Sequence, residues 1–189
     1  MKNICVFCSS SSAVSGDYFR AARDLGRSLG ENNFTLVYGG VSVGLMGELA
    51  GASTASGGTV ISVIPESIRN KGITYEKADR IIFTKDLRER KAVMEEMSDA
   101  FIALPGGFGT LEEVMEILTL KQLKLQAKAV VFINTNGFYD NLLRFFDTIY
   151  SESFAKRIFQ NLYSVVPDAE SAIRALRDYE PVELESKWY

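Results

Sequence analysis

The sequence from Ala100 to Glu113 reads Ala-Phe-Ile-Ala-Leu-Pro-Gly-Gly-Phe-Gly-Thr-Leu-Glu-Glu and joins an apolar run to a glycine-rich turn and a helical pattern. Residues 100–104 are apolar in succession, which is typical of a strand covered on both faces of a parallel sheet. Three glycines within four residues let backbone N–H groups come close to an anion at the start of a helix. A buried strand that leads through such a turn into a helix predicts a doubly wound α/β fold.

The same alternation continues on both sides of this stretch. Apolar runs predict strands at 3–8, 35–38, 59–64, 80–84, 100–104, 129–133 and 163–166. Helical patterns occupy about 17–30, 44–57, 86–98, 110–122, 138–150 and 168–177, and residues 65–77 are expected to form a loop. We therefore expect a single Rossmann-like α/β domain with a mostly parallel sheet of about seven strands flanked by helices. This domain takes up residues 1–178, and residues 179–189 form a C-terminal tail with little pattern.

Composition narrows the classes of partner. The 189 residues are 47% hydrophobic and carry a net charge of −3, so no basic surface is indicated and nucleic acid is not expected as a partner. No apolar run approaches the ~20 residues that span a bilayer. Met1-Lys2-Asn3 leads straight into the first strand, without the pattern of a signal peptide, so we expect a cytoplasmic protein.

The cysteine and histidine counts restrict the chemistry. Cys5 and Cys8 form a C-x-x-C pattern, but residues three apart on a strand point to opposite faces, so the thiols are not expected to meet. The chain has no histidine, which excludes Ser-His-Asp and Cys-His catalysis and histidine-based metal sites. We expect neither a metal nor a cofactor, and a reaction carried by carboxylates, cations, hydroxyls or backbone amides.

Two further loops follow predicted strands, where ligands bind in this class of fold. Ser9-Ser10-Ser11-Ser12 follows the first strand and either holds a phosphate or ribose or caps the next helix. The stretch from Gly39 to Gly47, Gly-Gly-Val-Ser-Val-Gly-Leu-Met-Gly, matches neither the dinucleotide fingerprint nor a P-loop. Its glycines suit either an anion site or close packing of helix on sheet.

Two charged stretches have more than one interpretation. Thr110-x-x-Glu113 is spaced as a capping box, so Glu113 is either a capping residue or a catalytic one. The stretch from Asp86 to Lys91, Asp-Leu-Arg-Glu-Arg-Lys, places cations at the start of a helix, where the dipole disfavours them. This is either a solvated helix end or a site for an anionic ligand.

Arg90-Lys91 and the motif P-G-G-x-G-T-x-x-E at 105–113 together resemble the LOG (Lonely Guy) family. Members are cytokinin riboside 5′-monophosphate phosphoribohydrolases, long described as lysine decarboxylases. The serine loop, the Gly39-Gly40 turn, Gly44-Leu45-Met46-Gly47 and Asn136-Gly137-Phe138-Tyr139 also resemble that family, so the likeness covers about residues 3–178. Relatives often have His where this chain has Arg88 and Trp where it has Leu120, which leaves the shape of the base pocket open.

The resemblance implies a catalytic pair and a set of nucleotide contacts. Arg90 and Glu113 would be catalytic. The substrate-binding residues would be Lys91, Gly106, Gly107, Phe108, Gly109, Thr110, Leu111, Glu112, Thr119, Ser9, Ser10, Gly40, Gly44, Met46 and Glu66.

The activity that follows is hydrolysis of the N-glycosidic bond of a cytokinin-type or AMP-like purine nucleoside 5′-monophosphate, giving free base and ribose 5-phosphate. Arg90 would either hold the phosphate or assist the departing base. A lysine decarboxylase would need a Schiff-base lysine for pyridoxal phosphate, and no lysine stands out as one. The alternative is a non-catalytic nucleotide sensor or carrier of the same fold.

Apolar residues on two helical segments predict a partner. In 138–150 they cover more than one side of the helix, and in 111–123 the apolar face is similarly broad. The resemblance likewise implies a homodimer with the nucleotide site near the interface. The other interpretation is that the sheet and the C-terminal segment cover both helices.

Overall fold

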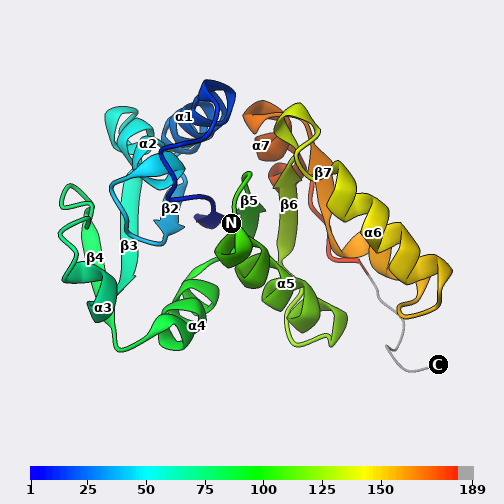
Figure 1. The fold of residues 1–189 in the computed structure, drawn as a ribbon. Coiled ribbons are helices and arrows are strands. Elements are labelled where there is room, and N and C mark those ends of the chain that lie inside the picture. The colour runs from blue at the N-terminus through cyan, green and yellow to red at the C-terminus, as the bar shows by residue number, and fades with distance from the viewer. Residues whose placement is uncertain (183–189) are drawn as a thin grey trace.

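The computed structural model describes residues 1–182 and confirms the predicted α/β class (Figure 1). Seven strands form one sheet: β1 Asn3–Phe7, β2 Thr35–Tyr38, β3 Thr59–Pro65, β4 Arg80–Thr84, β5 Ala100–Ala103, β6 Ala129–Ile133 and β7 Ser164–Val166. The α-helices are α1 Gly16–Glu31, α2 Gly44–Ala55, α3 Glu66–Arg69, α4 Leu87–Met97, α5 Phe108–Gln122, α6 Asp140–Ser151 and α7 Ala169–Arg177. Two 3₁₀ segments, η1 Thr135–Gly137 and η2 Arg157–Leu162, flank α6.

The strand order is β4-β3-β2-β1-β5-β6-β7, and each neighbouring pair is parallel. The chain moves outward from β1 to β4, then returns to the centre, where β5 pairs with β1 and Ile4 lies opposite Ala100. The direction of winding therefore reverses between β1 and β5. In open parallel sheets, ligands bind beyond the carboxyl ends of the two strands at such a switch point.

Helices cover both faces of the sheet, as Figure 1 shows. Side chains alternate along β1: Ile4 and Val6 join the core under α1, α2 and α7, whereas Cys5 and Phe7 join the core under α4, α5 and α6. Each fully buried aliphatic or aromatic side chain contributes about 1.5–3 kcal/mol to folding. Cys8 lies in the first core and Cys5 in the second, and both thiols are free, so the prediction that they do not meet is confirmed.

Two of the predicted elements differ from the structure. The expected loop at 65–77 contains the one-turn helix α3, and Thr74 in it makes an antiparallel bridge to Val41. Helix α5 begins at Phe108, two residues before the predicted start, because the glycine turn itself enters the helix. The other bounds agree to within two residues.

The described part of the predicted tail is attached to the domain. The Tyr179 hydroxyl donates a hydrogen bond to the Ala127 carbonyl at 2.7 Å, and the Lys121 ammonium lies 4.9 Å from the Tyr179 ring. Residues 183–189 of that tail lie outside the described residues.

A search of the described chain for a helix with the length and apolar character needed to cross a membrane finds none.

Candidate active site

The serine loop after β1 packs directly on the glycine-rich turn before α2. The Met46 amide donates to the Ser9 carbonyl at 3.2 Å. Gly44 has φ +63°, and a Cβ there would lie 2.3 Å from the Ser10 carbonyl carbon, so this contact requires glycine at 44. The serine loop and the α2 turn therefore form one wall at the carboxyl end of the sheet.

The turn between β5 and α5 forms the opposite wall. Tyr139, 1% exposed, donates its hydroxyl hydrogen bond to the Leu104 carbonyl at 2.7 Å and so holds the end of β5. A Cβ on Gly106 would lie 2.1 Å from the Thr110 hydroxyl oxygen, so that hydroxyl fits against the turn only because residue 106 is glycine.

The structure excludes the interpretation of Glu113 as a capping residue. Gly107 is the N-cap of α5 and provides no side-chain cap, so the first-turn amides remain directed beyond the helix end. Thr110 and Glu113 lie inside the helix, both buried, and do not form a capping box. A reciprocal cap similar to a capping box is found instead at the start of α4. The Asp86 carboxylate accepts a hydrogen bond from the Glu89 amide at 2.8 Å, and the Glu89 carboxylate accepts one from the Lys85 amide at 2.6 Å.

Arg90 and Glu113 form a buried ion pair. The Arg90 Nη2 atom lies 2.8 Å from the Glu113 Oε1 atom, and their side chains are 9% and 6% exposed. Burial raises the pKa of the Glu113 carboxyl above its usual range, and the Arg90 charge opposes that rise. Within residues 1–182 the buried Nε of Arg90 has no hydrogen-bond partner. Because desolvation can outweigh the attraction in a buried pair, this pair need not add to the stability of the fold.

The pair borders a cavity of about 200 Å³, which we call the switch-point cavity. It is lined by Cys8, Ser9, Ser10, Met46, Arg90, Gly107, Gly109, Thr110 and Glu113. Eight of these nine residues were candidates from the sequence. Cys8 was not, although its position directly after β1 was a usable signal. Burial, with Glu113 adding to it, raises the pKa of the Cys8 thiol, which favours the neutral thiol over the reactive thiolate.

The remaining candidates lie around this cavity or away from it. Gly40 and Gly44 have positive φ and shape the α2 turn, and Gly106 shapes the α5 turn, while Leu111 packs into the core behind it. Phe108 is 94% exposed at the start of α5.

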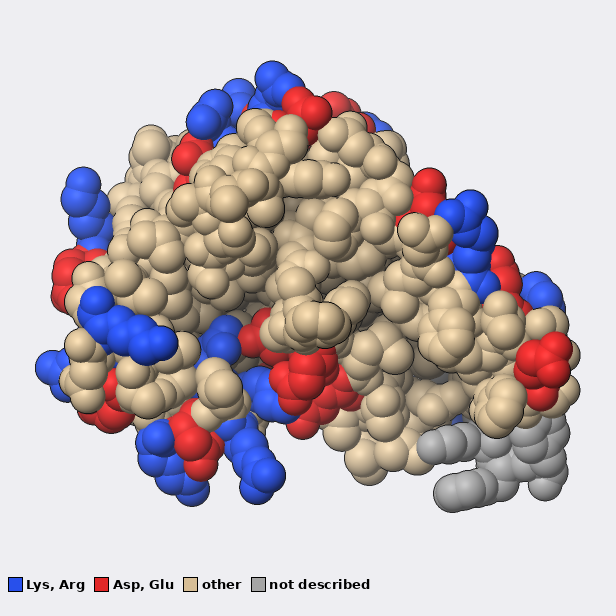
Figure 2. Space-filling model, viewed as in Figure 1, with Lys and Arg blue, Asp and Glu red and all other residues tan. Residues whose placement is uncertain are grey.

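Lys91 pairs with Glu112 and, at 2.7 Å, with Glu116. Figure 2 shows basic and acidic side chains side by side over α4 and α5. Glu66, on α3, faces Arg69 at 3.4 Å, and Thr119 lines a groove farther along α5; neither lines the switch-point cavity.

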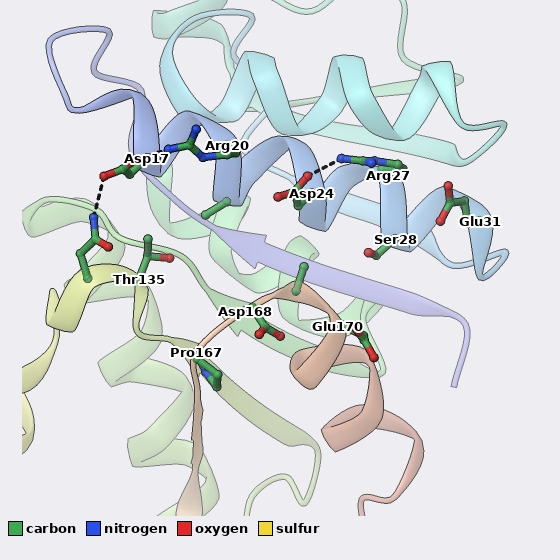
Figure 3. A pocket seen from close by; sticks show the side chains of 13 residues that line it. Asp17, Arg20, Asp24, Arg27, Ser28, Glu31, Thr135, Pro167, Asp168 and Glu170 are labelled. Atoms are coloured by element: carbon green, nitrogen blue, oxygen red, sulfur yellow. Dashed lines mark hydrogen bonds and ion pairs between the residues drawn. The ribbon is translucent and has the colours of Figure 1, made fainter.

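A larger cavity, of about 570 Å³, lies between α1 and α7, and we call it the α1–α7 cavity (Figure 3). Its arginines are paired within α1: Arg20 with Asp17 and Arg27 with Asp24. Asp168, on the opposite side in Figure 3, caps α7. No group of three or more His, Cys, Asp or Glu side chains suited to a metal ion occurs anywhere in the part of the chain that the structure describes.

These features define a class of protein: a doubly wound α/β protein with an uncapped helix N-terminus and a buried Arg–Glu pair at the switch point of its sheet. Residues 46–176 match a family model described as "Possible lysine decarboxylase". Of the curated relatives, a probable cytokinin riboside 5′-monophosphate phosphoribohydrolase, LOGL9, of Oryza sativa subsp. japonica is 44% identical over 96% of this chain and 80% of its own length. The enzyme LOG7 of Arabidopsis thaliana is 43% identical over 95% of this chain and 83% of its own length. The chain belongs to the LOG family.

Solved structures with a similar fold carry a different description. A molybdenum cofactor binding protein from Rippkaea orientalis has a TM-score of 0.72 and 20% identity, covering 94% of this chain and 96% of that one. A molybdenum cofactor carrier protein from Chlamydomonas reinhardtii has a TM-score of 0.72 and 24% identity, covering 93% and 96%. At these identities the likeness establishes the shared fold alone.

Proposed function

We propose that the protein hydrolyses the N-glycosidic bond of purine nucleoside 5′-monophosphates, cytokinin-type or AMP-like, to free base and ribose 5-phosphate. The observation that carries this is the buried Arg90–Glu113 pair at the switch-point cavity, in a chain 41–44% identical to enzymes named for that reaction. The enzyme is thus an N-glycoside hydrolase.

The 5′-phosphate is proposed to bind at the start of α5. Gly107 and Gly109 line the cavity there, the first-turn amides have no side-chain cap, and the helix dipole favours an anion. The serine loop supplies the hydroxyls of Ser9 and Ser10 from the opposite wall. Anchoring this remote group would direct binding energy to positioning the ribose.

Glu113 is proposed to act on the ribose. N-glycoside cleavage passes through an oxocarbenium-like transition state, in which positive charge develops on the sugar. A carboxylate in a water-poor cavity stabilises that charge and orients the attacking water. Since the Arg90 guanidinium already contacts Glu113 at 2.8 Å, we assign it first to holding that carboxylate.

A carrier is the second candidate, because similar folds occur in proteins named as cofactor carriers. The two are separated by incubating the purified protein with AMP and a cytokinin riboside 5′-monophosphate and measuring free base and ribose 5-phosphate by chromatography. Release of both products in equal amounts supports hydrolysis. Tight nucleotide binding without product would instead identify a carrier, and the ratio of rates gives the preferred base.

We also propose a two-fold homodimer. A groove between α5 and α6, of about 230 Å³, is lined by Met115, Leu118, Thr119, Gln122, Phe146, Ile149, Tyr150, Phe154, Ala155, Phe159, Leu162 and Tyr163. Phe154 is 85% and Phe145 59% exposed. An apolar surface of this kind favours a partner of the same kind, burying more than about 1,200 Å² in total.

Light scattering at micromolar concentration tests the dimer. We expect twice the chain mass of 21.0 kDa, and Phe154→Asp should shift the population toward monomer. A wild-type mass near 21.0 kDa would contradict the proposal.

We propose a cytoplasmic location for the protein. Cell fractionation with an antibody to the chain tests it.

A further inference from the structure

Gly39, the residue directly after β2, lies against the guanidinium of Arg90. A Cβ at position 39 would be 2.4 Å from the Arg90 Nη2 atom and 3.2 Å from its Cζ atom. It would also be 3.2 Å from the methyl carbon of Met46. A carbon at 2.4 Å from a guanidinium nitrogen is far inside van der Waals contact, so with any other residue at 39 the guanidinium could not keep this position.

The backbone does not require glycine at position 39. Its neighbour Gly40 has φ +77°, a conformation that favours glycine, whereas Gly39 is not among the glycines with positive φ. Glycine is therefore required at these two adjacent positions for different reasons. At position 40 the turn needs a positive φ, and at position 39 the Arg90 guanidinium needs the space that a side chain would fill.

The Nη2 atom that meets this space is also the atom that pairs with Glu113, at 2.8 Å. Arg90 reaches the site from α4, whose start is fixed by the Asp86 cap. The guanidinium is thus confined between the end of β2 and the Glu113 carboxylate, with its Nε unpartnered within residues 1–182. A displacement of the Arg90 guanidinium away from position 39 would lengthen its contact with Glu113 or change the direction in which its Nε–H points.

We propose that Gly39 is a positioning residue for hydrolysis: the space left by its missing side chain sets the guanidinium of Arg90 against Glu113. This rests on the proposed function for its effect on rate, while its effect on Arg90 stands apart from it. Gly39 touches neither substrate nor reacting atoms in this assignment; it acts through Arg90.

The kinetic test compares Gly39→Ala with Gly51→Ala, an α2 glycine where an added Cβ meets nothing within 4 Å. We expect Gly39→Ala to lower kcat for AMP at least ~10-fold with a KM change under ~3-fold, and Gly51→Ala to change neither. Because the Arg90 charge lowers the pKa of Glu113, its displacement should also move the acid limb of the kcat/KM profile to higher pH. A loss of kcat with an unmoved limb would indicate a merely structural role and overturn the proposal.

A second measurement needs no activity. In a ¹⁵N NMR spectrum, the Nε–H signal of Arg90 is assigned by its loss in Arg90→Ala. That signal should move in Gly39→Ala and stay in place in Gly51→Ala; an unmoved signal in Gly39→Ala overturns the proposal. If the wild type hydrolyses no nucleotide but the signal moves, the proposed function fails and the positioning role stands.

Should Gly39→Ala not fold, the double variant Gly39→Ala with Arg90→Ala decides. Removal of the guanidinium makes room for the new methyl group, so the double variant should fold as Arg90→Ala alone does. Failure of the double variant to fold, while Arg90→Ala folds, would mean that position 39 needs glycine for another reason.

Discussion

The α1–α7 cavity and the switch-point cavity contrast in two ways: the first is larger, and the second has the buried charges. The α1–α7 cavity, at about 570 Å³, is almost three times the volume of the switch-point cavity, at about 200 Å³. In the large one, Arg20 and Asp17 are 67% and 44% exposed and come from the same helix. In the small one, Arg90 and Glu113 are 9% and 6% exposed and come from different helices.

This difference, and not volume, is what distinguishes the proposed site from the α1–α7 cavity. An exposed pair on one helix adds only ~0–1 kcal/mol and needs no further explanation. A buried pair loses several kcal/mol of hydration per ion and persists only where the surrounding structure or the function requires it. The predictions below test whether activity follows the buried pair and ignores the exposed ones.

The largest effect should come from Glu113→Gln. This change keeps the shape of the side chain but removes the charge opposite the developing oxocarbenium ion, so kcat for AMP should fall ~100- to 1000-fold, equivalent to ~2.7–4 kcal/mol. Circular dichroism should show an unchanged fold. A folded Glu113→Gln variant with near-wild-type turnover would show that the buried pair has no part in the mechanism. The burial of its charges would then no longer favour the switch-point cavity as the active site.

The next effect concerns the phosphate. With the α5 amides binding an anion, kcat/KM for AMP should exceed that for adenosine by at least ~10-fold, the worth of one charge-assisted hydrogen bond. Initial rates on the two substrates, measured in parallel, give the ratio. Equal rates would mean that the start of α5 does not bind the phosphate.

A third effect is in the pH profile. Burial raises the pKa of Glu113 above 4.5, and the proposed reaction needs the ionised carboxylate. Activity should therefore fall as pH drops through that raised pKa, by ~10-fold per pH unit below it. Stopped assays of kcat/KM between pH 4 and 8 measure this limb. A rate that instead declines on the alkaline side would assign Glu113 as a proton donor.

The smallest effect should come from the large cavity. Arg20→Gln removes an exposed pair, so kcat/KM should stay within ~2-fold of the wild type and the free energy of unfolding within ~0.5 kcal/mol. Urea titration and the AMP assay check both quantities. A marked loss of activity in Arg20→Gln would give the α1–α7 cavity a role that its exposed pairs do not indicate.

The sequence predicts the fold closely because each element carries its own pattern. Buried strands such as β5 and β6 are apolar throughout, and the glycine turn places the start of α5 to within two residues. Helix α3 is missed because a single turn, Glu66–Arg69, is too short for a periodic pattern.

The site is less predictable than the fold, because it depends on contacts across long sequence separations. Spacing alone fits Glu113 to a capping box, and only the resemblance to the family pairs it with Arg90. The contact between Gly39 and Arg90 cannot be predicted from the spacing of neighbouring residues, because the two are 51 positions apart in the sequence. Buried Lys121 is also unforeseen: its ammonium donates to the Leu162 carbonyl at 2.8 Å, and burial lowers its pKa to about 8.

The central place of β1 has a consequence for biosynthesis. Of the seven strands in this sheet, β1 is synthesised first; it pairs on one side with β2, but its other edge stays open until β5 has been made. The Asp99 carboxylate, just before β5, accepts hydrogen bonds from the backbone amides of Lys2 and Asn3. These contacts join residues that are 97 and 96 positions apart in the sequence. Until then the nascent chain exposes an apolar strand edge of the kind that pairs with other chains. Synthesis stalled before Ala100 should therefore leave this edge of β1 open to pairing with other chains, whereas pairing with β5 covers it and leaves β6 and β7 to complete the sheet.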